Sequence, residues 1–213
     1  MVDFSEIINA IQTGNAKKSE SLTVEYLNNK VSAKDILNNG LIKAMEIVGE
    51  KFKNNEFYVP EVLVAARAMK KSINILRPIL AQTGVESAGK ILIGTVEGDL
   101  HDIGKNLVHM MFEGAGFEII DLGTDVPPEK FVKVAKEEKP DILGMSALLT
   151  TTMTSMQKTI DLLEREGLRN EIFIMIGGAP VTESYVKEIG ADGYATDASS
   201  AVEIAKKHLN QKD

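Results

Sequence analysis

Five short apolar segments, each followed by a stretch of about helix length, constrain the fold of this chain more than any other feature. The segments are 91–96, 117–122, 142–146, 172–176 and the weaker 193–195. The stretches that follow them are amphipathic, so strand and helix alternate five times. This alternation is typical of a doubly wound α/β domain. We therefore expect a five-stranded parallel sheet with a flavodoxin-like (Rossmann-like) topology.

The first eighty residues carry a helical period instead. Apolar residues at spacings of three and four predict four helices, over 4–11, over 17–27, from Ser32 and from Pro60. Ser32-Ala33-Lys34-Asp35 is a capping box for the third helix. The apolar face of the fourth helix should hold Leu63, Ala66, Met69, Ile73 and Leu76. Four helices with short connections predict a four-helix bundle that forms an N-terminal cap.

These two patterns divide the chain into two domains. We expect a helical cap domain over 1–83, a linker over 84–89 and an α/β domain over 90–213. Small and polar residues break the periodicity at the linker. With 213 residues, the chain is long enough for both domains to bury a core.

Charge and composition exclude several classes of partner. The net charge of −7, with no basic cluster, argues against nucleic acid and anionic membrane as partners. The chain has no Cys, so any metal must be held by His, carboxylate or hydroxyl groups. The N-terminus is acidic, and no apolar run is long enough to span a membrane, so we expect a cytoplasmic protein.

The segment Asp99-Leu100-His101-Asp102-Ile103-Gly104 follows the first predicted strand, where open α/β sheets bind ligands. In an extended segment, residues two apart point the same way, so Asp99 can approach the ring of His101 and fix its tautomer. A carboxylate behind an imidazole is typical of a metal ligand. The alternative is an ordinary loop in which the Asp caps the helix and the His is solvated.

Two further loops should open at the same edge of a parallel sheet. They are Ser146–Thr152, after the third strand, and Gly177-Gly178, after the fourth. A flavodoxin-like strand order would place a ligand between the first loop and Ser146–Thr152. The alternatives are that the hydroxyls cap a helix and that the glycines only relieve a tight turn. The sequence lacks Gly-x-Gly-x-x-Gly after the first strand, a Walker-type lysine motif and a Gly-x-Ser-x-Gly elbow, so the corresponding functions lose support.

In order and spacing, the three loops match the signature D-x-H-x-x-G, S-x-L, G-G, and the chain resembles the corrinoid (cobalamin-binding) proteins of methyltransferase systems. The helical half agrees independently. Its Gly49-Glu50-Lys51-Phe52, Val59-Pro60 and Ala65–Lys70 are similar to the four-helix cap of methylamine and methanol corrinoid proteins and of methionine synthase. The resemblance covers essentially the whole chain.

The resemblance implies cobalamin as the cofactor, bound base-off/His-on, with His101 as the lower axial ligand of cobalt. Asp99 would hold the far ring nitrogen, and Thr152 stands where the family has the hydroxyl of a His–Asp–hydroxyl relay. Phe52 and Val59 match the two apolar residues that shield the upper, methyl-bearing face, although the second is commonly larger. The other cofactor-binding residues implied are Asp102, Ile103, Gly104, Ser146, Leu148, Thr150, Gly177 and Gly178.

The function implied is that of a methyl carrier. A substrate-specific corrinoid methyltransferase would load the cobalt, and a second methyltransferase would pass the methyl group to a thiol coenzyme or tetrahydrofolate. A reductive activator protein is a further expected partner, and the chain would be a carrier component rather than a complete enzyme. Three alternatives stay open: the small cobalamin-binding subunit of a mutase, a cobalamin-responsive regulator, and an α/β binding module without cobalt.

Overall fold

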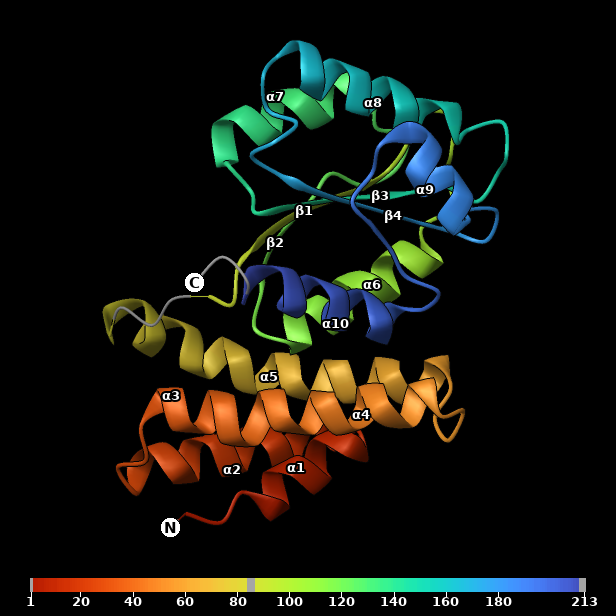
Figure 1. Cartoon of the computed structure of the whole chain (residues 1–213). Coiled ribbons are helices and arrows are strands. Elements are labelled where there is room, and N and C mark those ends of the chain that lie inside the picture. Colours follow the sequence, from red (N-terminus) through yellow and green to blue (C-terminus); the bar gives the residue numbers. More distant parts are fainter. Residues whose placement is uncertain (1, 84–86, 211–213) are drawn as a thin grey trace. The chain divides into compact units, whose positions relative to one another are not determined.

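The computed structural model describes residues 2–83 and 87–210 (Figure 1). The described residues form two compact units, which fall within Met1–Ser87 plus Glu113–Gly116 and within Ala88–Phe112 plus Phe117–Asp213. The predicted linker lies partly outside the described residues, at 84–86, and Ser87–Gly89 has irregular backbone. Among the described residues, no helix is long and apolar enough to cross a membrane.

The first unit is helical, as predicted. Its elements are α1 (Ser5–Gln12), α2 (Ala16–Asn28), α3 (Ala33–Asp35), the π-helix η1 (Ile36–Ile42), α4 (Lys43–Lys53) and α5 (Val59–Thr83). Because α3, η1 and α4 follow one another without a break, they form one continuous helix, and the described residues of the unit contain four helices in this sense. The predicted four-helix bundle is confirmed.

The helix that begins after Ser32 differs from the prediction in its middle. The Ser32 hydroxyl accepts a hydrogen bond from the Asp35 amide at 3.0 Å, as expected for an N-cap. The spacing of apolar residues predicts Leu37 on the buried face, but the π-helix buries Ile36 fully and leaves Leu37 only half-buried. A π turn holds more residues than an α turn. The buried stripe therefore changes phase here, which an α-helical period cannot predict.

The buried face of α5 also differs from the prediction. Met69 and Leu76 are buried as expected, but Leu63 is exposed, and Val62 takes the buried position one residue earlier. The reason is a polar residue on the buried face: Ser72 is fully buried, with its hydroxyl 2.6 Å from that of Ser19 on α2. A search for apolar periodicity misses a stripe that includes a hydrogen-bonded serine.

The second unit is a parallel α/β sheet. Its strands are β1 (Lys90–Thr95), β2 (Glu118–Asp121), β3 (Ile142–Ser146), β4 (Phe173–Gly177) and β5 (Gly193–Tyr194). They pair in parallel in the order β2-β1-β3-β4-β5. The predicted five-stranded flavodoxin-like sheet is confirmed, and its topological switch lies between β1 and β3.

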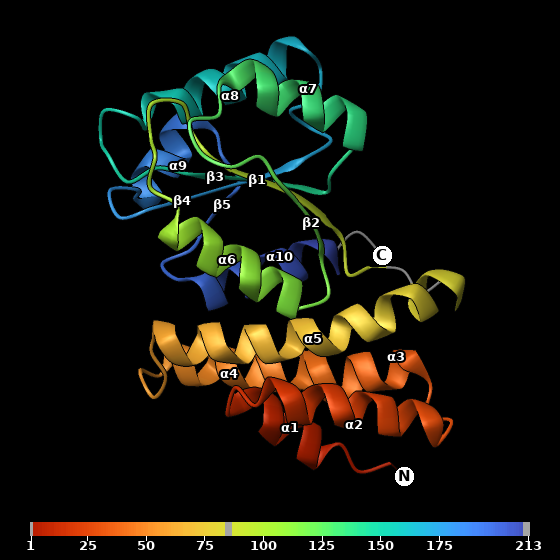
Figure 2. The same ribbon diagram turned by 180° about the vertical axis from the view of Figure 1, so that it is seen from behind.

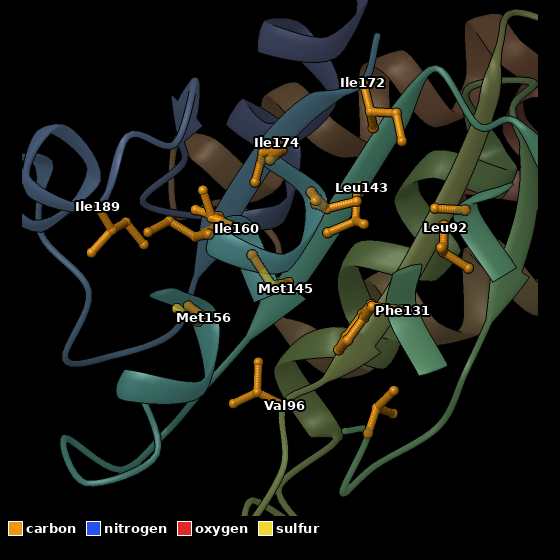
Figure 3. Packing of buried hydrophobic residues seen from close by; sticks show 14 of the residues in the cluster. Leu92, Val96, Phe131, Leu143, Met145, Met156, Ile160, Ile172, Ile174 and Ile189 are labelled. Carbon is orange, nitrogen blue, oxygen red and sulfur yellow. The ribbon is translucent and has the colours of Figure 1, made fainter. Parts of the chain in front are cut away.

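Helices cover both faces of this sheet. They are α6 (Ile103–Gly114), α7 (Pro128–Glu138), α8 (Thr154–Arg165), α9 (Glu183–Ile189) and α10 (Ala198–Leu209). Figures 1 and 2 show α7, α8 and α9 over one face and α6 beside α10 over the other. Phe131 of α7 and Met156 of α8 pack onto strand residues such as Leu143 in the core of the first face (Figure 3). This core fixes the strands, and thus the loops at their carboxyl ends.

Candidate functional site

The loop between β1 and α6 (residues 96–102, the first loop) carries the predicted metal ligand. The ring Nδ1 of His101 lies 2.8 Å from Asp99 Oδ1, which also accepts a hydrogen bond from the His101 amide at 3.0 Å. The His101 side chain is 52% exposed, whereas that of Asp99 is fully buried. Within the described part of the chain, the other ring nitrogen, Nε2, has no hydrogen-bond partner. The arrangement fixes the ring through one nitrogen and leaves the second available.

Asp99 also joins the first loop to the loop between β3 and α8 (residues 147–153, the third loop). Its Oδ2 accepts hydrogen bonds from the amides of Leu148 at 2.7 Å and Leu149 at 3.3 Å. The hydroxyl of Thr152 donates to the same oxygen at 2.8 Å, and its Oγ1 lies equally close to the Leu149 carbonyl. The predicted grouping of His101, Asp99 and Thr152 is therefore present.

The environment of Asp99 keeps its carboxyl ionised. Burial by itself would raise the pKa of this group, but the hydrogen bonds donated by the first and third loops outweigh burial and hold the pKa far below its usual range. A charged carboxylate next to Nδ1 favours a proton on that nitrogen. Nε2 is then the nitrogen with the free electron pair, as metal coordination requires.

Exposed apolar side chains flank this histidine. Leu100 is 73% and Ile103 is 78% exposed, and Leu148 and Leu149 of the third loop are exposed as well. Exposed leucines and isoleucines are common singly, but Leu100, Leu148 and Leu149 come from two loops that one carboxylate joins, and Ile103 begins the helix after the first of them. These loops therefore carry exposed apolar side chains close to His101 in the chain or joined to it through Asp99.

The two glycines after β4 have different surroundings. Gly178 has a φ of +127°, and a Cβ there would lie 1.8 Å from the Ala147 carbonyl oxygen, so the backbone contact between the loops requires glycine. A Cβ on Gly177 would meet nothing within 4 Å. A contact within the protein thus explains the need for glycine at Gly178 but not at Gly177.

The remaining predicted residues lie in different places. Asp102 and Gly104 flank the start of α6, Ser146 ends β3, and Thr150 is exposed on the third loop. Phe52 on α4 and Val59 at the start of α5 are half-buried, and both belong to the helical unit. Their proposed shielding role stays a prediction.

Sequence reasoning missed the residues that brace the first loop. The Thr95 hydroxyl donates to the His101 carbonyl at 3.0 Å. Asp125, in the loop between β2 and α7 (residues 122–127, the second loop), accepts from the Gly98 amide at 2.7 Å. The buried Lys105 on α6 forms an ion pair with Asp121 at the end of β2. One signal could have found them: β2 also ends at this edge of a parallel sheet, so the residues at and after its end should lie near the first loop.

The donor set limits which metal could bind. Among the described residues, no group of three or more His, Asp or Glu side chains could hold a metal ion. His101 would therefore suit a metal that brings most of its own ligands.

Models of two families match the chain. Both carry the description B12 binding domain, and they cover residues 89–203 and 4–77. A corrinoid protein of Desulfitobacterium hafniense is 43% identical over 209 residues, which is 97% of each chain. Dimethylamine corrinoid protein 2 of Methanosarcina acetivorans is 44% identical over 87% of each chain. A chain in the crystal structure of the methanol:cobalamin methyltransferase complex of Methanosarcina barkeri is 28% identical with a TM-score of 0.87, over 96% of this chain and 78% of that one.

Proposed function

This chain belongs to the family of B12 binding domains, and we propose that within it the protein is a corrinoid methyl carrier that binds cobalamin base-off/His-on. The family and its cofactor, cobalamin, are as the three loop motifs predicted. The finer proposal is that His101 supplies the lower axial ligand of cobalt. The observation that carries it is the Asp99–His101 contact of 2.8 Å, which holds Nδ1 and leaves Nε2 available.

The residues present fit this cofactor. A corrin ring supplies the equatorial ligands of its cobalt, so one protein nitrogen is enough where no cluster of acidic or histidine ligands exists among the described residues. The exposed Leu100, Ile103 and Leu148 would contact the apolar parts of the ring. The open space at Gly177 supports a path for the nucleotide tail. Ser146 pairs with Gly177 in the sheet, and Thr150 is exposed on the third loop, so both could contribute to this path.

When bound, cobalamin supplies a cobalt ion that accepts and releases a methyl group. The chain's own residues control the ligand and its proton. Asp99 keeps the proton of His101 on Nδ1 while Nε2 is a ligand, because the carboxylate is held ionised by the third loop. Asp99 and Thr152 would help to hold the proton at Nδ1 of this imidazole. Phe52 and Val59 would exclude water and oxidant from the upper face.

The relatives support a carrier that works with separate enzymes. One relative is named a dimethylamine corrinoid protein, and another belongs to a methanol:cobalamin methyltransferase complex. For this chain we propose a substrate-specific corrinoid methyltransferase, an acceptor methyltransferase that acts on a thiol coenzyme or tetrahydrofolate, and a reductive activator as partners. A corrinoid protein that aligns along 97% of the chain favours this function over the mutase subunit and the regulator.

Cobalamin binding to the purified apoprotein tests the axial ligand. Wild-type protein should convert added methylcobalamin to the form without benzimidazole ligation, and cob(II)alamin on the protein should show an imidazole nitrogen in its electron paramagnetic resonance spectrum. His101→Ala should lose that nitrogen signal. A matched control is His208→Phe, which removes an imidazole from the same unit but keeps an aromatic ring stacked on Phe173. The protein is labelled with ¹⁵N, so that a protein nitrogen splits the signal differently from the unlabelled benzimidazole nitrogen of cobalamin. A ¹⁵N splitting that survives His101→Ala would end the proposal.

The carrier role needs a second test. A methyltransferase that uses methylamines, supplied with dimethylamine, should methylate the reduced cobalamin on the wild-type protein, and the absorbance of the methylated form reports the transfer. Cobalamin binding without any methyl transfer, combined with stimulation of a mutase large subunit, would favour the mutase alternative.

A further inference from the structure

An ion pair with a buried lysine lies beside the first loop and has no part in the proposed ligand set. Lys105 Nζ is 2.6 Å from Asp121 Oδ2, and the Lys105 side chain is only 2% exposed. Lysine is almost never this buried unless it is paired. Because desolvation offsets most of the attraction, such a pair is weak evidence for stability and is better explained by the geometry that it fixes.

The pair connects to the first loop along α6. Lys105 Nζ also donates to Asn106 Oδ1 at 2.8 Å, and the side-chain Nδ2 of Asn106 donates to Asp102 Oδ2 at 2.9 Å. Asp102 follows His101 directly in the chain. His109, one turn further along α6, has Nδ1 3.2 Å from Asp121 Oδ2. The first two turns of α6 are therefore tied to the carboxyl end of β2.

The second loop continues the connection to the other end of the first loop. Asp121 Oδ1 accepts from the Gly123 amide at 2.9 Å, which fixes where this loop starts. Asp125 then accepts from the Gly98 amide at 2.7 Å with its side chain and donates to the Asp99 carbonyl at 3.0 Å with its own amide. The first loop is thus held before His101 by Asp125 and after it by the Lys105–Asp121 pair.

We propose that Lys105, Asp121 and Asp125 are positioning residues that set the place of the His101 imidazole for coordination of cobalt. This inference rests on the proposed function. Metal ligation tolerates only a few tenths of an ångström in ligand position. Asp99 fixes the ring and ties the first loop to the third loop, which follows β3. Lys105, Asp121 and Asp125 tie the first loop and the start of α6 to β2 and the second loop on the other side.

The charge state of Asp121 agrees with this role. Burial by itself would raise the pKa of the Asp121 carboxyl, but the hydrogen bonds from Lys105, Gly123 and His109 outweigh it and lower the pKa. The carboxylate that organises the second loop is therefore ionised at neutral pH.

The test compares two ion pairs of the same unit in the full-length protein. Lys105→Met and Asp121→Asn remove the pair beside the first loop. Arg169→Met and Asp192→Asn remove a matched ion pair that does not contact the first loop. Like Asp121, Asp192 accepts a hydrogen bond from a backbone amide, that of Ile174. Each variant is titrated with hydroxocobalamin, reduced to cob(II)alamin and examined for the imidazole nitrogen signal, and its Tm is recorded.

A positioning role predicts a result that a purely stabilising role does not. Lys105→Met and Asp121→Asn should bind cobalamin about tenfold more weakly and carry a smaller imidazole-ligated fraction, as for other residues behind a metal ligand. The Arg169 and Asp192 variants should lower Tm and leave that fraction unchanged. In Lys105→Met/Asp121→Asn, where neither charge is left buried alone, Tm should recover while the ligated fraction stays low.

Two outcomes separate this inference from the proposed function. A wild-type protein that binds cobalamin without imidazole ligation would overturn the proposed function. Wild-type ligation combined with an undiminished ligated fraction in Lys105→Met and Asp121→Asn would overturn the positioning role alone. If Lys105→Met does not fold, Asp121→Asn and Asp125→Ala test the positioning role. A positioning role predicts that Asp125→Ala speeds amide hydrogen exchange at 98–101 in the apoprotein and reduces the imidazole-ligated fraction in the holoprotein.

Discussion

The carbonyl oxygen of Ala147 lies 1.8 Å from the position that a Cβ atom would take on Gly178. The third loop and the loop after β4 are in backbone contact here, since the Ala147 amide also donates to the Gly177 carbonyl at 3.1 Å. The edge of the sheet that carries His101 is therefore built with no room for a side chain at Gly178.

Gly178→Ala should destabilise the protein strongly. The added methyl group meets backbone, which cannot rotate away, and a φ of +127° is unfavourable for alanine. We expect a loss of about 3 kcal/mol in the free energy of unfolding, measured by urea denaturation.

Gly177→Ala is the matched control, with the opposite expectation. Its Cβ meets nothing within 4 Å, so the free energy of unfolding should change by less than about 1 kcal/mol. Cobalamin should nevertheless bind more weakly, because the methyl group would enter the space proposed for the nucleotide tail. Unchanged cobalamin affinity in this variant would remove Gly177 from the proposed site.

Replacement of Thr152 should separate its hydroxyl from its shape. Thr152→Val removes the hydrogen bond to Asp99 Oδ2, and we expect a cost of about 1–3 kcal/mol in stability together with a rise in the Asp99 pKa. Thr152→Ser keeps the donor and should keep the low pKa. Unfolding experiments measure the change in stability, and a carboxyl NMR titration measures the change in the Asp99 pKa. Equal results for the two variants would contradict the role of the Thr152 hydroxyl.

Phe52→Ala should expose the upper face of bound cobalamin if the shielding proposal is right. We expect faster air oxidation of the reduced holoprotein, followed by visible absorbance, because an apolar cover excludes water and oxidant. Phe4→Ala is the control, since Phe4 is a half-buried aromatic of the same unit that packs on Tyr26. Equal oxidation rates in the two variants would contradict the role of Phe52.

Acidification should weaken α10 through its N-cap, Asp197. Burial by itself would raise the pKa of this carboxyl, but hydrogen bonds from Ser200 and Thr196 outweigh it and lower the pKa. Because the unfolded value is about 3.9, the stabilisation is complete above that pH and is lost as pH falls toward the lower folded-state pKa. Asp197→Asn keeps a capping oxygen and should show a smaller loss of stability between pH 6 and pH 3, roughly the range over which carboxyls titrate.

Much of the fold follows from local sequence patterns. It was possible to predict the five strands and the four helices of the first unit, because the spacing of apolar residues reflects secondary structure directly. The alternation of strand and helix also predicted the flavodoxin-like topology. The phase of the buried stripes was less predictable. The π-helix at Ile36–Ile42 and the buried Ser72 each shift a helix face, and both depend on which neighbouring side chains fill the space.

The sequence by itself determined that His101 and Asp99 are close, because residues two apart in an extended loop share a side. It also identified the three loop motifs that mark the family. Only the tertiary structure brought Thr152 to Asp99 across 53 residues, paired Lys105 with Asp121 and pressed Gly178 against Ala147. The physical reason is that these contacts depend on strand order and on the close packing of loops from neighbouring strands, which no local periodicity encodes.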